Sequence, residues 1–171
     1  MKKILKEKKG EHPFGDTGQL IIFVLFMLVW VTDSFFLHLS TFLLDYLPLY
    51  FRLGFLALLL IIAVLLFRSA HFVTSEDKRP KRVVETGAFR YVRHPLYLAS
   101  ILVYFGLAVS TASFFSLAVF IGISIFYNFI STYEEKLLEI KFGDKYINYK
   151  QKTGKWVPRI RVGRKKIVRE T

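Results

Sequence analysis

Long apolar stretches separated by short charged segments dominate the chain. The first stretch covers residues 20–44 and is interrupted only by Asp33 and His38. The second covers residues 47–67 and is interrupted only by Arg52. Because a helix that spans a membrane needs about 20 apolar residues, each of these stretches predicts one membrane-spanning helix.

The third apolar stretch runs from residue 95 to residue 133 without one Lys, Arg, Asp, Glu or His. It is about twice as long as a single spanning helix requires, so it predicts two helices joined in a hairpin. The turn is expected at residues 110–113, where Ser-Thr-Ala-Ser forms a small polar cluster near the middle of the stretch. We therefore expect four spans, at about residues 20–42, 49–69, 95–110 and 113–133.

Composition favours a membrane protein and excludes several other classes. Of the 171 residues, 53% are hydrophobic, 18 are Phe and 9 are Tyr, and the mean hydropathy is +0.39. A soluble domain of this size cannot bury that much apolar surface, and the same numbers exclude disorder. The absence of Cys excludes a disulfide scaffold and a thiolate metal site, and no metal is expected. The predicted fold is an all-α, polytopic integral membrane protein, one domain over residues 1–171, with two N-terminal spans in residues 20–69.

The distribution of charge predicts the orientation. The formal net charge is +12, and with four spans only Arg52 of the 25 Lys and Arg residues lies on the face opposite to the others. The positive-inside rule makes the basic face cytoplasmic, so both termini are expected in the cytoplasm, most simply that of a prokaryotic cell. The basic segments should contact anionic lipid headgroups, and no nucleic acid is expected as a partner. The first span is too long for the core of about 7–15 residues in a cleaved signal peptide.

A helical segment is expected on the cytoplasmic side after the fourth span. Residues 134–140 should continue the helix, and Gly143 should stop or kink it. Asp144 can cap a short following helix that holds Tyr146 and Tyr149. Residues 162–171 are highly charged and are expected to fray or to lie on headgroups.

Two polar motifs lie at the cytoplasmic ends of the predicted hairpin. Residues 93–97 read Arg-His-Pro-Leu-Tyr where the third span begins, and Pro95 suits a first helical turn because its missing N–H would have no partner there. Residues 134–135 are both Glu and stand where the fourth span ends, so the hairpin should bring the two motifs to one membrane surface. Each motif alone has a simpler explanation: Arg93 as an interfacial anchor, His94 as a structural hydrogen-bonding group, and the glutamates as solvated charges.

Both motifs also belong to longer patterns. Residues 85–98 (ETGAFRYVRHPLYL) resemble the signature of the isoprenylcysteine carboxyl methyltransferase family, which is related to the phospholipid methyltransferases. The Glu pair, followed by Leu138, Phe142, Gly143, Tyr146, Tyr149 and then Pro158, is similar to the second block of that family. The resemblance covers roughly residues 80–160, whereas the first two spans match only as hydrophobic helices.

The resemblance implies an enzyme that transfers a methyl group from S-adenosylmethionine, with residues 80–160 as the catalytic and cofactor-binding region. It implies a lipophilic small molecule or a lipid-anchored group as the acceptor, with a carboxylate favoured and a phospholipid amine or a small thiol left open. Catalytic roles carry over to Arg93, Glu134 and Glu135. Cofactor-binding roles carry over to Gly87, Tyr91, His94, Pro95, Tyr97, Leu98, Tyr146 and Tyr149.

Other functions remain open at this stage. A planar Arg could orient an acceptor carboxylate, or the Glu pair could help an acceptor amine to lose a proton. Membrane sterol reductases carry a similar Arg-His-Pro-x-Tyr motif, so an NADPH-dependent membrane reductase is an alternative, and a non-catalytic membrane scaffold is another. The oligomeric state is also left open.

The distribution of charge leads to a test of topology. Reporter fusions after Lys9, Arg82 and Thr171 are expected to report a cytoplasmic location, and a fusion near Tyr46 an external one, because the basic segments should remain on the cytoplasmic side. An external C-terminus would contradict the four-span arrangement and would separate the two polar motifs.

Overall fold

The computed structural model describes residues 15–75 and 82–159, and in these ranges the secondary structure is helical apart from one isolated parallel bridge between Val92 and Gly154. The helices are α2 (Gly15–Val31), the π-helix η1 (Thr32–Leu37), α3 (Leu49–Ser75), the 3-10 helix η2 (Gly87–Arg90), α4 (Pro95–Ser110), α5 (Phe114–Phe142) and α6 (Asp144–Lys152). Predictions that concern the N-terminal lysines, Lys78, Arg79, Lys81 and residues 162–171 lie outside the described residues.

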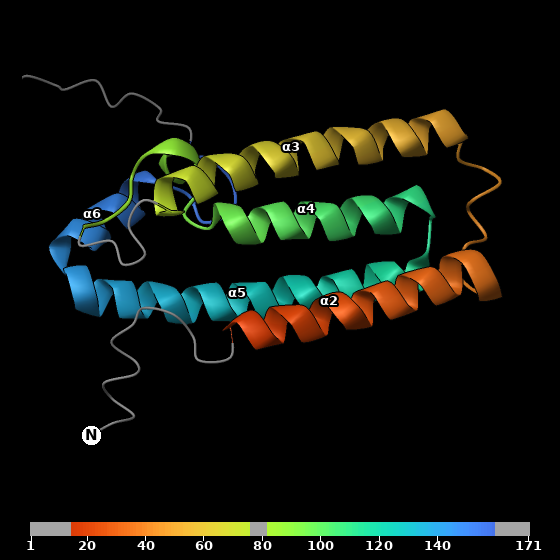
Figure 1. The fold of residues 1–171 in the computed structure, drawn as a ribbon, viewed down its shortest axis with the longest axis horizontal. Coiled ribbons are helices and arrows are strands. Elements are labelled where there is room, and N and C mark those ends of the chain that lie inside the picture. The colour runs from red at the N-terminus through yellow and green to blue at the C-terminus, as the bar shows by residue number, and fades with distance from the viewer. Residues whose placement is uncertain (1–14, 76–81, 160–171) are drawn as a thin grey trace, which may run out of the picture.

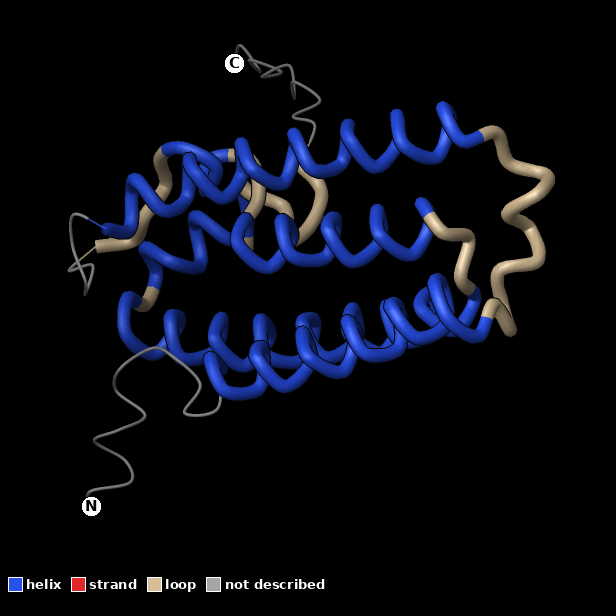
Figure 2. Tube along the Cα trace, turned by 45° about the vertical axis from the view of Figure 1, so that its right-hand side comes forward, coloured by secondary structure: helices blue, strands red, loops and turns tan. Residues whose placement is uncertain are grey.

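The four long helices run side by side and turn at opposite ends of an elongated bundle (Figure 1). Helix α3 packs on α4, α4 packs on α5, and α2 packs on both α5 and α4. The link from η1 to α3 and the turn from α4 to α5 lie at one end, which we call the far end (Figure 2). Helix α6, η2 and the start of α4 lie at the other end, which we call the site end (Figure 1).

Length and composition identify the bundle as membrane-spanning. Three helical stretches are long and apolar enough to cross a membrane, at Thr17–Leu37, Leu49–Val73 and Phe114–Phe142, and α4 is a shorter apolar helix. Many large apolar side chains of α2 and α3 are exposed, among them Phe23, Leu28, Leu58 and Leu65, as expected for surfaces that face lipid. The prediction of an all-α polytopic membrane protein is confirmed.

The hairpin is also confirmed. Helix α4 ends at Ser110 and α5 begins at Phe114, as the polar cluster at residues 110–113 predicted. Ser113 caps α5, because its Oγ accepts a hydrogen bond from the backbone N–H of Ser116 at 3.1 Å. Helix α5 then continues past the expected end of the fourth span at residue 133 to Phe142.

The first span differs from the prediction at its end. Helical structure stops at Leu37 rather than near residue 42, and His38 follows in a left-handed conformation with φ of 52°. Asp33 is buried near the end of this helical stretch, and its side chain binds residues beyond the helix. Its carboxylate accepts hydrogen bonds from the backbone N–H of Ser40 at 3.1 Å and from Ser113 Oγ at 2.6 Å.

Arg52 lies in the first turn of α3, at the far end of the bundle, and its side chain is buried. Its Nε donates to the carbonyl of Leu47 at 3.0 Å, and its Nη1 donates to the carbonyl of Ser110 at 2.7 Å. Arg52 therefore links α3 to the end of α4.

The break between α5 and α6 lies at Gly143, as predicted. Gly143 has φ of 57°, a conformation that side-chain-bearing residues rarely adopt, and its N–H donates to the carbonyl of Glu139 at 2.8 Å. The prediction that Asp144 caps α6 is wrong: Gly143 is the N-cap residue, and Asp144 is the first residue of the helix. At that position its negative charge interacts favourably with the positive N-terminal end of the helix dipole.

Candidate functional site

Pro95 begins α4, so the residues just before it form the entrance to that helix. The N–H of Arg93 donates to the carbonyl of Gly154 at 2.9 Å, beside the bridge between Val92 and Gly154. The entrance of α4 is thus joined by its backbone to the segment that follows α6. Arg93 and His94 consequently lie between α5 and the C-terminal segment.

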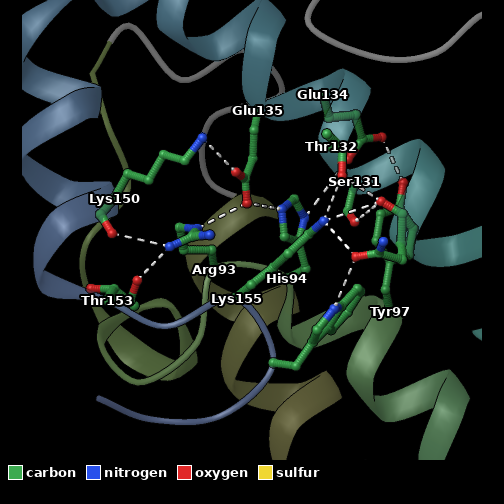
Figure 3. A network of polar contacts seen from close by, with 12 residues as sticks. Arg93, His94, Tyr97, Ser131, Thr132, Glu134, Glu135, Lys150, Thr153 and Lys155 are labelled. Carbon is green, nitrogen blue, oxygen red and sulfur yellow. Dashed lines mark hydrogen bonds and ion pairs between the residues drawn. The ribbon is translucent and has the colours of Figure 1, made fainter. Parts of the chain in front are cut away.

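The Glu135 carboxylate is the centre of this region (Figure 3). The residue is 3% exposed. Its Oε1 accepts a hydrogen bond from Arg93 Nε at 2.9 Å and lies 3.1 Å from His94 Nε2. Its Oε2 lies 3.0 Å from the ammonium of Lys150 on α6. One carboxylate on α5 therefore contacts both the entrance of α4 and α6.

Arg93 makes further bonds that complete this arrangement. Its Nη1 donates to the carbonyl of Lys150 at 3.0 Å and to the carbonyl of Thr153 at 2.6 Å. The Arg93 side chain is only 7% exposed, so it does not extend to the interface as a membrane anchor. It instead joins α5 to the end of α6.

Glu134 makes a different set of contacts on the same turn of α5. Its Oε1 accepts a hydrogen bond from the hydroxyl of Tyr97 at 2.6 Å, and its Oε2 lies 3.9 Å from His94 Nδ1. Adjacent helical positions point about 100° apart, yet both glutamates contact the residue 93–97 motif. The structure therefore brings together Arg93, His94, Tyr97, Glu134 and Glu135, as the two motifs predicted.

Burial favours the neutral form of the His94 imidazole. Burial is the main reason that the pKa of its imidazole lies below the ordinary value of 6.5; the nearby Glu135 opposes this shift, while the positive charges of Lys155 and Arg93 add to it. A neutral imidazole has one N–H, and the network assigns it to Nε2, which donates to Glu135. Nδ1 is then left with a lone pair that can accept a proton.

Some residues of this region were not identified from the sequence. Lys155 Nζ donates to Thr132 Oγ1 at 2.7 Å and to the side-chain and backbone oxygens of Asn128 at 2.8 and 3.1 Å. The ring of Trp156 lies 5.8 Å from that of His94, centroid to centroid. Asn128 was visible only as one amide in an apolar run, and nothing in the sequence paired it with Lys155.

The remaining predicted cofactor residues line cavities or support the helix. A cavity of about 690 Å³ opens at the site end, lined by Glu85, Thr86, Gly87, Arg90, Tyr91, Tyr149, Lys152, Thr153 and Arg159. A smaller, mainly apolar cavity of about 180 Å³ is lined by Arg82, Val83, Val84, Phe89, Arg93, Leu138, Phe142, Tyr146 and Tyr149. The two cavities share Tyr149, whose hydroxyl donates to the carbonyl of Phe89 at 2.7 Å. Pro95 is buried in the first turn of α4, and the N–H of Leu98 closes that turn on the carbonyl of His94 at 3.0 Å.

The described residues contain no group of three or more His, Cys, Asp or Glu side chains that could hold a metal ion. The polar groups of the described site include two carboxylates, a guanidinium, an ammonium, an imidazole and a phenol.

The network leads to a matched test of stability. Glu135 and Glu139 both contact Lys150, at 3.0 and 2.7 Å, but their side chains are 4% and 33% exposed. Glu135→Gln is expected to lower the free energy of unfolding by about 3–5 kcal/mol, because it leaves Arg93 buried without its charged partner. Glu139→Gln is expected to cost less than about 1 kcal/mol. Both are measured by unfolding in mixed detergent micelles, and equal effects would contradict the central place of Glu135.

Comparison of the amino-acid sequence with known proteins identifies related methyltransferases. A sequence model described as phospholipid methyltransferase matches residues 49–145, more than half of the chain. Methanethiol S-methyltransferase of Crocosphaera subtropica is 29% identical over 157 residues, which cover 86% of this chain and 53% of that protein. Methanethiol S-methyltransferase 1 of Bradyrhizobium diazoefficiens is 30% identical over 93 residues, which cover 54% of this chain and 32% of that protein.

The chain thus spans about half the length, or less, of these curated relatives. No solved structure matches it. The matched residues 49–145 include the entrance of α4, the hairpin and the Glu pair, so the relationship predicted from the two motifs is confirmed. The chain belongs to the phospholipid methyltransferase family.

Proposed function

We propose that this protein transfers a methyl group from S-adenosylmethionine to a small or lipophilic thiol at the cytoplasmic surface of a prokaryotic cell membrane. The observation that carries the proposal is the buried network in which Arg93, His94 and Tyr97 contact Glu134 and Glu135. It lies within the family match and at the end of the bundle where the basic segments 82–93 and 136–159 gather. The family match favours methyl transfer over the reductase and scaffold alternatives.

The cavity at the site end fits the proposed methyl donor. Its volume of about 690 Å³ lies within the range of about 300–1,000 Å³ for pockets that hold molecules of this size. Glu85 and Arg90 would pair with the ammonium and carboxylate groups of the methionyl part, and the Tyr91 ring would cover part of the adenosine. When bound, S-adenosylmethionine supplies an electrophilic methyl group on a positively charged sulfur, and the charges of Glu134 and Glu135 would favour that cation nearby.

The thiol acceptor is proposed because of what Arg93 already binds. The resemblance favoured a carboxylate acceptor held by a planar Arg, but here Nε and Nη1 of Arg93 donate to Glu135 and to two backbone carbonyls. The small cavity beside Arg93 is mainly apolar, which suits an uncharged, apolar acceptor better than an anion. Two relatives are named methanethiol S-methyltransferases, and this chemistry is consistent with such a cavity.

The residues of the chain supply the proton transfer. His94 Nδ1 would accept the proton of the acceptor thiol, because burial favours the neutral imidazole and Nε2–H donates to Glu135. Glu134, 3.9 Å from Nδ1, would stabilise the imidazolium that forms. Trp156 and Tyr97, whose ring centroids each lie 5.8 Å from that of His94, would exclude water. A phospholipid amine, suggested by the family description, is the second candidate acceptor.

The function is tested with the whole protein in detergent. Calorimetry is expected to show binding of S-adenosylhomocysteine and no binding of NADPH. Tritiated methyl label from S-adenosylmethionine is expected to pass to methanethiol and to longer alkyl thiols. Label found only in phosphatidylethanolamine would replace the thiol by an amine acceptor, label found only in a prenylated cysteine would restore the carboxylate acceptor, and failure to bind S-adenosylhomocysteine would refute methyl transfer.

A second experiment tests the role of Arg93. Arg93→Lys keeps a positive charge but loses the planar fork that serves Glu135 and two carbonyls. We expect kcat to fall about 100-fold, the scale that follows when reacting groups are misplaced, with a smaller change in affinity for S-adenosylhomocysteine. The matched control is Arg68→Lys, at an exposed arginine of α3, which should stay within about threefold of wild type. A similar kcat for the two variants would remove Arg93 from the site.

A further inference from the structure

Residues 153–157, which we call the closing turn, follow α6 and return to the bundle. Thr153 and Gly154 are buried, and the carbonyl of Gly154 accepts the N–H of Arg93 at 2.9 Å. The turn is so tight that a Cβ on Gly154 would lie 1.8 Å from the carbonyl oxygen of Val157. This position therefore requires glycine, and the closing turn has a defined shape rather than that of a loose tail.

The second half of the closing turn is held to α5 by side chains. Lys155 Nζ contacts Asn128 and Thr132 through three oxygens at 2.7–3.1 Å, and Trp156 Nε1 donates to Asn128 Oδ1 at 3.4 Å. Asn128 and Thr132 are four positions apart, so they lie on the same face of α5. We call these contacts of Lys155 with Asn128 and Thr132 the clasp.

The clasp brings an aromatic cover over the site. The Trp156 ring lies 5.8 Å from the ring of His94, and the Tyr97 ring stacks on His94 at the same centroid distance of 5.8 Å. Trp156 also packs against the buried core cluster that contains Tyr104 and Tyr127. Lys155 Nζ lies 5.6 Å from the centroid of the Trp156 ring, so a cation–π interaction also joins the ammonium to this ring.

The side chain of Lys155 is partly buried. Burial lowers the pKa of its ammonium below the ordinary value, because the charged form loses hydration. The three oxygens of the clasp replace part of that hydration, and charge-assisted hydrogen bonds of this kind are stronger than neutral ones. An ammonium that served only solubility would point to water, so the contacts of Lys155 call for a structural purpose.

We propose that Lys155 is a positioning residue whose clasp holds Trp156 over His94, and that release of the clasp opens this side of the site to water. The inference rests on the proposed function of this site. It assigns to Lys155, Asn128 and Thr132 a role that is separate from the proton chemistry of His94 and the glutamates.

The test uses the small number of tryptophans. The chain has two, and Trp30 lies in α2, where its Nε1 donates to the carbonyl of Leu107 at 3.0 Å, so Trp30→Phe leaves Trp156 as the sole fluorescent tryptophan. In this background Lys155→Met removes the ammonium and keeps an apolar stem. We expect red-shifted emission, stronger quenching by acrylamide and a kcat about tenfold lower, because Trp156 no longer excludes water from His94, while the affinity for S-adenosylhomocysteine stays within about threefold; a tenfold change corresponds to about 1.4 kcal/mol.

Matched variants make the result specific to the clasp. Lys155→Arg keeps a cation and should show quenching as low as wild type. Thr132→Val should give an intermediate effect, and it replaces Lys155→Met if that variant fails to fold. Lys145→Met, at an exposed lysine of α6, should change nothing. Unchanged quenching of Trp156 in Lys155→Met or Thr132→Val would overturn the clasp. Increased quenching with unchanged kcat would overturn its role in excluding water from His94. If the wild type binds no S-adenosylhomocysteine, the proposed function and the water-excluding role both fail, while quenching still decides whether Lys155 holds Trp156.

Discussion

The buried carboxylate of Glu135 is the interaction on which the site depends. It contacts Arg93 and His94 at the entrance of α4 and Lys150 on α6, so α4, α5 and α6 meet at one side chain. Removing a carboxylate from water costs several kcal/mol unless partners replace the lost hydration. The same contacts that satisfy the charge therefore fix the relative positions of α4, α5 and α6.

This arrangement divides the work among the polar groups. Arg93 is turned toward protein oxygens rather than toward a ligand, so it acts through Glu135 and the carbonyls of Lys150 and Thr153. His94 shares Glu135 with Arg93, and burial lowers the pKa of its imidazole. Glu134, bound by Tyr97, supplies a second negative charge on the other side of the imidazole. The sequence predicted only that Arg93 and the two glutamates would meet, and did not indicate these separate roles.

The sequence allowed much of the fold to be predicted, because apolar length is a strong signal for helices in a membrane. The hairpin turn at Ser113 and the break at Gly143 followed from local chemistry. The end of the first span did not, since Asp33 is satisfied by Ser40 and Ser113, and such distant contacts leave no trace in a hydropathy pattern. The capping role of Asp144 failed for a local reason: Gly143 already occupies the N-cap position.

The same reasoning explains which part of the site was predictable. The contact between residues 93–97 and the Glu pair follows from the antiparallel hairpin. The start of α4 and the C-terminal part of α5 lie at the same end of the bundle. The closing turn is different: Lys155 reaches Asn128 and Thr132 only because the segment after α6 folds back on α5. Helices inside a membrane cannot release backbone hydrogen bonds, since no water is present to replace them. Opening of the site must therefore use contacts between side chains at an aqueous end. At the site end, the second half of the closing turn is held to α5 by the side chains of Lys155 and Trp156, and water can replace these contacts.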